Sequence, residues 1–223
     1  MTATDAIRQT VVELCLALSQ RGYFAATGGN IALRIDADRF AVTPSATDYL
    51  TMTASDVCVL RLADLARLEG ARAPSVESGM HARVLRARPD AQCSIHTHQP
   101  VASACALLGR ALDVPAALQP SLGRKVPVVG YAPSGTGWLS AKLARELRPD
   151  IHGYLLRNHG ALCCGRTVDA ARQAIEDLEM LARSCLQELI ATRAARVPAV
   201  RSILAHVSDA LAHPSTEPPL DAR

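Results

Sequence analysis

The sequence predicts one α/β domain, and three observations lead to this prediction. The chain has 223 residues, a length at which a single core can bury roughly 70–75% of the unfolded surface. Several long segments place apolar residues on one face of a helix, at intervals of three or four. Between them lie short alternating or apolar segments of strand length. We therefore expect one domain over residues 1–212, followed by a flexible tail over 213–223 that contains three prolines.

The first half of the chain shows both patterns. Helices are expected over residues 5–21 and 77–88, and strands over 31–35, 39–43 and 57–62. Gly22 ends the first helix and Pro89 the second, since glycine and proline interrupt helices. Residues 66–75 have no periodic pattern and end in Ala-Pro-Ser, which predicts a loop.

The second half follows the same organisation. A strand is expected over residues 93–95, continuing into His96-Thr97-His98, and another over 153–157. Helices are expected over 100–109, 139–147 and 168–192, with a weaker helix after Pro198 that ends near Leu211. Residues 112–138 are rich in proline and glycine, which predicts short strands and loops.

The composition excludes several classes of partner. The net charge is only +3 and aromatic residues make up 3%, whereas nucleic-acid-binding proteins concentrate basic and aromatic side chains on one surface. We therefore expect an anionic small molecule as partner and no nucleic acid. The N-terminus has no signal-peptide pattern and no apolar run approaches the length of a membrane span, so no membrane partner is expected. Seven cysteines without a C-x-x-C pair indicate a reducing compartment, so a cytoplasmic protein is expected.

Two histidines separated by one residue, His96 and His98, are the sharpest local feature. Residues two apart on a strand project to the same face, so both imidazoles point at one site. Imidazole is a common ligand of zinc, and an open catalytic site needs three protein ligands. His159 is the best third candidate, because it ends a strand and Gly160 after it lets other groups come close. The alternative is a pair of surface histidines on an edge strand.

Glu77, at the start of a predicted helix, is the candidate acid–base residue. The helix N-terminus favours the ionised form of its carboxylate. In the alternative interpretation, Ser75 is the N-cap and Glu77 is an ordinary acidic residue of the first turn. His81 lies one turn further along the same face, where it is in position to hydrogen-bond to Glu77. The sequence favours a packed or exposed histidine without this contact.

The segment Thr27-Gly28-Gly29-Asn30 is a glycine turn flanked by a hydroxyl and an amide. Such a loop can bind an anion through its backbone N–H groups. A simple entry into the following strand explains the glycines equally well. Ser45, which follows Pro44, has the same two interpretations.

Five motifs taken together resemble a known family. In chain order they are Thr-Gly-Gly-Asn (27–30), Thr-Pro-Ser (43–45), Pro-Ser-x-Glu (74–77) before a helix that ends in Arg-Pro-Asp (88–90), Ile-His-Thr-His (95–98) and Arg-Asn-His-Gly (157–160). This order and spacing resembles the class II aldolase/adducin family, which includes the fuculose-phosphate aldolases. The resemblance covers residues 6–192.

The resemblance implies a fold, an assembly and a site. The fold is a mostly antiparallel central sheet flanked by helices in three layers, and the assembly is a homotetramer with active sites between subunits. Zn²⁺, or another divalent transition metal, would be held by His96, His98 and His159. Glu77 would be a further group at the metal and would leave it to act as base. The residues at the phosphate pocket would be Thr27, Gly28, Asn30, Ser45 and Ser75.

The activity that the resemblance implies is that of a zinc-dependent lyase of the aldolase type. Zinc would bind the hydroxyl and carbonyl oxygens of a sugar-phosphate-like substrate and stabilise the enediolate that carbon–carbon cleavage leaves. Glu77 would move the proton. Dehydratases and decarboxylases of the family use the same metal site and are the alternatives. A non-catalytic, adducin-like interaction module is the alternative from another class, and the presence of all four site residues argues against it.

Three positions depart from the fuculose-phosphate aldolase pattern. Val76 replaces a second serine at the phosphate pocket, and Ala46 replaces a glycine. Gln119 falls near the catalytic tyrosine of those aldolases, and an amide is no general acid. Methylthioribulose-phosphate dehydratases of the family also carry a small or apolar residue beside the serine and a Leu-Gln pair, here Leu118-Gln119, but this chain lacks the glutamate expected a little further along that loop. We therefore expect poor activity on fuculose phosphate.

Overall fold

The computed structural model describes residues 2–24 and 28–213. The strands are β1 (Asn30–Arg34), β2 (Arg39–Val42), β3 (Cys58–Arg61), β4 (Arg67–Glu69), β5 (Cys93–Thr97), β6 (Leu112–Asp113), β7 (Lys125–Val126), β8 (Val128–Val129), β9 (Gly153–Leu156) and β10 (Gly160–Gly165). The helices are α1 (Ala3–Gln20), α2 (Ser78–Ala87), α3 (Pro100–Ala106), α4 (Gln119–Leu122), α5 (Gly137–Glu146), α6 (Val168–Arg196) and α7 (Arg201–Ala212). Short 3-10 turns span Ala54–Asp56, Ala116–Leu118 and Pro198–Val200.

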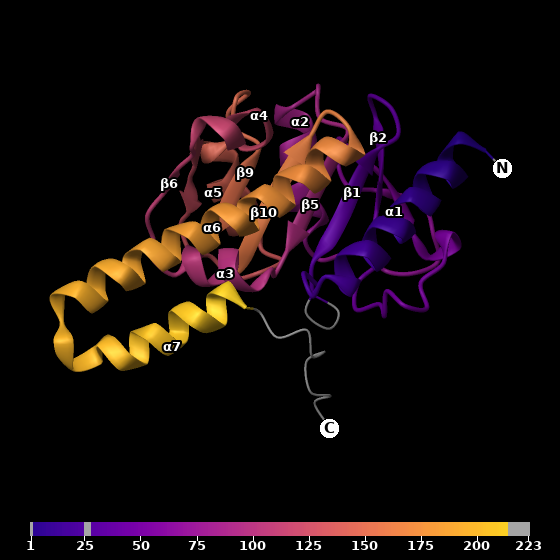
Figure 1. Ribbon diagram of the computed structural model, residues 1–223. Helices are drawn as coiled ribbons and strands as arrows, with labels where there is room; N and C mark the ends of the chain where they lie inside the picture. The colour runs from indigo at the N-terminus through magenta and orange to yellow at the C-terminus, as the bar shows by residue number, and fades with distance from the viewer. Residues whose placement is uncertain (1, 25–27, 214–223) are drawn as a thin grey trace.

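Eight strands form one sheet in the order β4-β3-β2-β1-β5-β10-β9-β8, and β6 and β7 form a separate ribbon. Neighbours in the large sheet are antiparallel except β8 and β9. Helices lie on both faces of this sheet (Figure 1). The expected α/β fold, with a mostly antiparallel sheet between helical layers, is confirmed.

Each central strand contributes to two hydrophobic cores, because successive side chains point to opposite faces. Ile31 of β1 joins the core that contains α1, α3 and α6, whereas its neighbour Ala32 joins the core under α2 and α5. On β5, Ile95 points into the first core. The same alternation leaves His96 on the face that α2 covers.

Helices α6 and α7 form a hairpin whose far end projects from the body of the protein (Figure 1). The buried residues of α6 lie between Ala171 and Ala182, and none of α7 is buried. The projecting part therefore contributes little to the core. None of the described helices combines the length and the apolar character that crossing a membrane requires.

The sequence patterns do not predict two of the strands, for different reasons. β10 has the sequence Gly-Ala-Leu-Cys-Cys-Gly and is buried on both faces, so it lacks the alternation of a half-buried strand. β4 lies within the expected loop 66–75, and all three of its residues are exposed at the sheet edge. Helix α2 begins at Ser78, with Glu77 as its N-cap. The segment 112–138 also contains the short helix α4.

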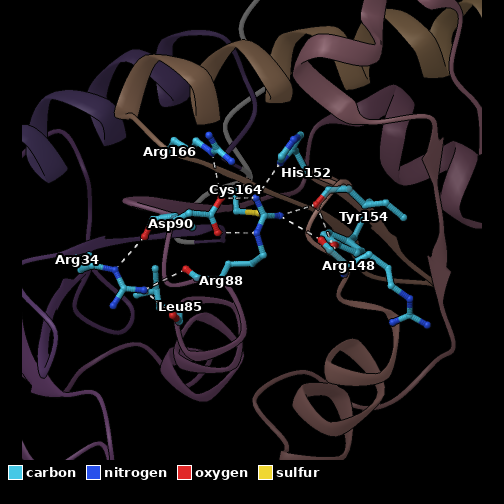
Figure 2. A network of polar contacts seen from close by, with 11 residues as sticks. Arg34, Leu85, Arg88, Asp90, Arg148, His152, Tyr154, Cys164 and Arg166 are labelled. Atoms are coloured by element: carbon cyan, nitrogen blue, oxygen red, sulfur yellow. Dashed lines mark hydrogen bonds and ion pairs between the residues drawn. The ribbon is translucent and has the colours of Figure 1, made fainter.

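A buried arginine, Arg88, joins the end of α2 to the connection between α5 and β9 (Figure 2). Its side chain is 2% exposed and donates to both carboxylate oxygens of Asp90, at 3.0 and 2.9 Å. Its Nη1 donates to the carbonyl oxygens of Arg148 and Ile151, at 3.2 and 2.9 Å. A buried charge is tolerated when it is paired and hydrogen-bonded, and Arg88 meets both conditions.

We expect this pair to make the stability of the fold depend on pH in acid. The hydrogen bond from Arg88 is the main cause that lowers the pKa of Asp90 below its ordinary value. Such a group adds stability above its unfolded pKa, about 3.9 for aspartate, and loses that contribution as the pH falls towards the folded value. Asp90→Asn should therefore flatten the decline of the unfolding free energy below pH ~4 in urea titrations. If the unfolding free energy of Asp90→Asn falls with pH as steeply as that of the exposed control Asp209→Asn, this role is contradicted.

Candidate metal centre

Three imidazoles from two segments meet at one end of β5 and β10. His96 lies within β5, His98 follows this strand directly, and His159 lies in the turn between β9 and β10. One ligand nitrogen from each ring lies within 4.8 Å of the other two. The structure thus brings the three predicted ligands together.

The third histidine reaches the other two because β10 runs directly beside β5. A Cβ added to Gly160 would lie 2.3 Å from the carbonyl oxygen of Thr97 and 2.9 Å from the ring of His98. Only glycine fits there, so the expectation that Gly160 permits a close approach is confirmed. Asn158 forms the turn with a φ of +56°, a left-handed conformation that asparagine adopts more readily than most residues.

The nitrogen atoms of this cluster fit a divalent metal. Nδ1 of His96 lies 2.8 Å from the carbonyl oxygen of Ala161. A carbonyl only accepts, so this Nδ1 carries the proton and Nε2 is left as a ligand. That Nε2 lies 3.1 Å from Nε2 of His98. Two unprotonated nitrogens repel each other at this distance, so either one of them carries a proton or a cation lies between them. Nδ1 of His159 is buried and has no hydrogen-bond partner within the described ranges.

The carboxylate of Glu77 lies against the three imidazoles. Its Oε2 is 3.2 Å from Nε2 of His96, and its Oε1 is 3.2 Å from Nε2 of His159. Asn30 donates to Oε2 and Ser134 donates to Oε1, both at 2.9 Å. Glu77 is only 5% exposed. Hydrogen bonds to both oxygens therefore fix the orientation of a carboxylate that has little access to solvent.

Burial and neighbouring groups act in opposite directions on Glu77. Burial alone raises its pKa, but the charge of His96 in its protonated form and the hydrogen bond from Asn30 outweigh burial and lower the pKa below the usual glutamate value. Burial lowers the pKa of His96 and of His98, so both rings are neutral at pH 7. Neutral imidazoles bind metals, and an ionised carboxylate beside them can accept a proton.

Helix α6 holds the turn that carries His98. The buried Gln99 donates to a carbonyl oxygen of α6 at 3.1 Å. Glu179 of α6 accepts hydrogen bonds from the backbone N–H groups of Val101 and Ala102, both at 2.9 Å. The first N–H groups of a helix have no partner inside it, so this carboxylate satisfies the start of α3.

Removing this carboxylate should destabilise the fold. Glu179→Ala leaves two buried N–H groups without an acceptor, which typically costs about 1.5–3 kcal/mol where the lost acceptor was charged. Urea unfolding followed by circular dichroism measures the difference. Glu188→Ala, at an exposed position of the same helix, is the matched control, and equal losses in the two variants would refute the capping role.

The predicted phosphate-pocket residues lie on neighbouring segments. Backbone hydrogen bonds and an isolated bridge join the segment that contains Ser45 to the segment that contains Ser75. The hydroxyl of Ser75 accepts from the N–H of Glu77 at 3.2 Å. Gly28 lies two residues before β1, and Thr27 lies outside the described residues. Phosphate binding by these residues stays a prediction.

Ala46, where the aldolase pattern has glycine, has a φ of +48°. Only glycine adopts this left-handed conformation without a steric cost, which is roughly 1–2 kcal/mol for other residues. The backbone here therefore keeps the shape that favours glycine, although the residue has changed.

The structure identifies site residues that the sequence patterns do not predict. Ser134 lies in the loop before α5, and its only sequence signal is the turn Pro-Ser-Gly-Thr. His81 follows Glu77 by one helical turn, but its ring bonds to Asn30 and Ser94 instead of the carboxylate. Neither contact follows from local spacing, because the partners come from other elements.

Comparisons with known proteins agree with this geometry. The family model of the Class II Aldolase and Adducin N-terminal domain matches residues 9–186. A methylthioribulose-1-phosphate dehydratase of Serratia proteamaculans (strain 568) is 30% identical over 192 residues, which are 80% of this chain and 93% of that protein. A solved L-fuculose 1-phosphate aldolase has 28% identity and a TM-score of 0.75, covering 82% of this chain and 86% of its own. The l-fuculose-1-phosphate aldolase of Thermus thermophilus has 27% identity and a TM-score of 0.70, covering 84% and 96%. The chain therefore belongs to the class II aldolase and adducin family.

Proposed function

We propose that this protein is a zinc-dependent lyase that acts on a sugar-phosphate-like ketose, with Glu77 as its base. The observation that carries the proposal is the oriented carboxylate of Glu77 against three converging imidazoles. Bound there, a divalent metal polarises substrate hydroxyl and carbonyl oxygens and stabilises the negative charge that develops on them. An adducin-like interaction module has no use for such a site, so the geometry favours an enzyme.

Residues of the chain would bind the metal, accept the proton and bind the substrate. His96, His98 and His159 would hold the metal, and Glu77 would accept a proton from the substrate. The hydrogen bonds from Asn30 and Ser134 keep the carboxylate in place before and after the transfer. The residues proposed to bind the anionic end of the substrate are Thr27, Gly28, Asn30, Ser45 and Ser75.

Two lyase reactions begin from the same bound ketose. In aldolase-type cleavage, the base takes a proton from a hydroxyl, the adjacent carbon–carbon bond breaks, and the resulting carbanion needs a proton from an acid. In dehydration, the base takes a proton from the carbon beside the carbonyl, and the hydroxyl on the next carbon leaves as water once it is protonated. Both require the base, but only cleavage requires an acid at the carbanion.

Dehydration is the reaction that we favour. The relative from Serratia proteamaculans carries the name of a dehydratase and is matched over 93% of its length. Gln119 supplies no acid for cleavage, and its amide donates to the carbonyl oxygen of Val114 in its own loop at 2.9 Å. Aldolase-type cleavage is the second candidate, supported by the 28% identity to an L-fuculose 1-phosphate aldolase.

Kinetics with the zinc-loaded protein test the proposal. Methylthioribulose phosphate, fuculose phosphate and phosphorylated tetronates are the substrates to compare. We expect the highest kcat/KM on methylthioribulose phosphate and poor activity on fuculose phosphate. A kcat/KM on fuculose phosphate of about 10⁴ M⁻¹s⁻¹ or more, the low end for typical enzymes, would make aldolase-type cleavage the favoured reaction in place of dehydration. A fully metallated protein that converts none of these compounds would contradict the proposed function.

We also propose that a second copy of the chain completes the site, within a homotetramer. Val76 is 67% exposed although it adjoins the buried Glu77, and Trp138, four residues after Ser134, is 72% exposed. Large apolar side chains left exposed beside a buried site indicate a binding or subunit interface, and closed symmetric assemblies are the usual arrangement of identical chains. We expect a tetramer by light scattering at micromolar concentration. A monomer under these conditions would contradict the proposed assembly.

A further inference from the structure

A continuous chain of hydrogen bonds leads from Glu77 into the protein interior. Nδ2 of Asn30 lies 2.9 Å from Oε2 of Glu77, and Oδ1 of Asn30 lies 2.7 Å from Nε2 of His81. Nδ1 of His81 lies 2.8 Å from the hydroxyl of Ser94. His81 and Ser94 are fully buried and Asn30 is 6% exposed. Solvent therefore has almost no access to this chain.

The fold brings these four groups together on the face of the sheet that α2 covers. Asn30 of β1 pairs directly with His96 of β5. Ser94 lies two residues before His96 on the same strand, so the two side chains share a face. His81 lies on α2, one turn after Glu77. The helix that presents the carboxylate thus also presents the imidazole that reaches Asn30.

The chemistry of the four groups gives each hydrogen bond one direction. An ionised carboxylate only accepts, so Asn30 must turn its NH₂ towards Glu77 and its Oδ1 towards His81. Because Oδ1 only accepts, Nε2 of His81 must carry the proton. Burial lowers the pKa of His81 to about 4, so the ring is neutral at pH 7. Its Nδ1 then accepts from the hydroxyl of Ser94, and all three bonds point from Ser94 to Glu77.

We propose that His81 is a positioning residue, whose N–H on Nε2 orients the amide of Asn30 towards Oε2 of Glu77 while its Nδ1 accepts from Ser94. This inference rests on the proposed function, in which Glu77 is the base. Chains of hydrogen bonds that point one way strengthen each other in a buried site. The same arrangement leaves Asn30 only one N–H for a substrate phosphate, so its main contribution is to the base.

Two amide substitutions at position 81 separate the bond to Asn30 from the bond to Ser94. The Nε2 of glutamine in His81→Gln lies near the imidazole Nε2 and can still donate to Asn30. The shorter asparagine in His81→Asn reaches only Ser94. We expect His81→Asn to lower kcat on the zinc-loaded protein's best substrate by roughly 10- to 100-fold, the cost of misplacing a reacting group. KM and zinc content should change little, and His81→Gln should recover most of kcat.

Other kinetic outcomes overturn the proposal. Wild-type kcat in His81→Asn would show that the bond to Asn30 does not position the base. Equal losses of kcat in the two variants would show that His81 acts through packing alone. If the wild-type protein converts none of the tested substrates, the proposed function fails. The direction of the hydrogen-bond chain is then tested by a measurement that needs no substrate.

Nitrogen NMR of the histidine side chains provides that measurement. The His81 signals are assigned by their loss in His81→Gln, and we expect a single neutral tautomer with the proton on Nε2. Glu77→Gln should mix the two tautomers of His81, because a neutral amide no longer dictates which end of Asn30 faces it. A purely structural His81 would not respond to a substitution two hydrogen bonds away. A proton on Nδ1 in the wild-type protein, or an unchanged tautomer in Glu77→Gln, would refute the inference.

Discussion

Replacing His98 with alanine is expected to remove the bound metal. The wild-type protein should hold about one divalent ion per chain through three imidazoles, the ligand number of an open catalytic zinc site. The substitution leaves two nitrogens, which make a poor tetrahedral site. Elemental analysis after dialysis should therefore find His98→Ala almost free of metal, and the same is expected for His96→Ala.

The control for this experiment is His206→Ala. His206 is exposed on α7, and its Nδ1 lies 2.7 Å from the carbonyl oxygen of Ser202. This variant should bind as much metal as the wild type. A His98→Ala protein as fully metallated as the control would show that the metal site has been assigned to the wrong residues.

Changing Glu77 to glutamine should lower turnover by roughly 10²–10⁴-fold, the usual contribution of a general base. Glutamine keeps the size of the side chain but cannot accept the proton. Its amide can still accept from Asn30 or Ser134 through its remaining oxygen, so the site should stay assembled. Single-substrate kinetics and elemental analysis of the same preparation test both parts of this expectation.

The contrast between the two variants is the critical result. Glu77→Gln should lose activity and keep most of its metal, whereas His98→Ala should lose both. Glu188→Gln, at an exposed position of α6, is a control for the change of charge. Wild-type activity of Glu77→Gln at any pH would exclude the role of base.

The sequence alone predicts the long helices, the strands β1, β2, β3, β5 and β9, and the pair of proposed ligands. Those elements have strong local signals: periodic apolar residues for helices and alternation for half-buried strands. The spacing of His96 and His98 belongs to the same class of signal, because a strand places residues two apart on one face. The sequence also predicts that Gly160 permits a close approach of other groups. Its contact with the end of β5 explains why glycine follows His159.

Only the tertiary structure decides how the proposed base, Glu77, is held and where the proposed third ligand, His159, lies. β10 has no alternation because both of its faces are buried, so local pattern cannot show that it pairs with β5 and carries His159 to the site. Ser134 reaches Glu77 from a distant loop, and Asn30 connects the same carboxylate to His81 of α2, which in turn bonds to Ser94 of β5. These contacts depend on how strands and helices pack against each other, and hydrogen bonds between distant residues leave no periodic signal in the chain.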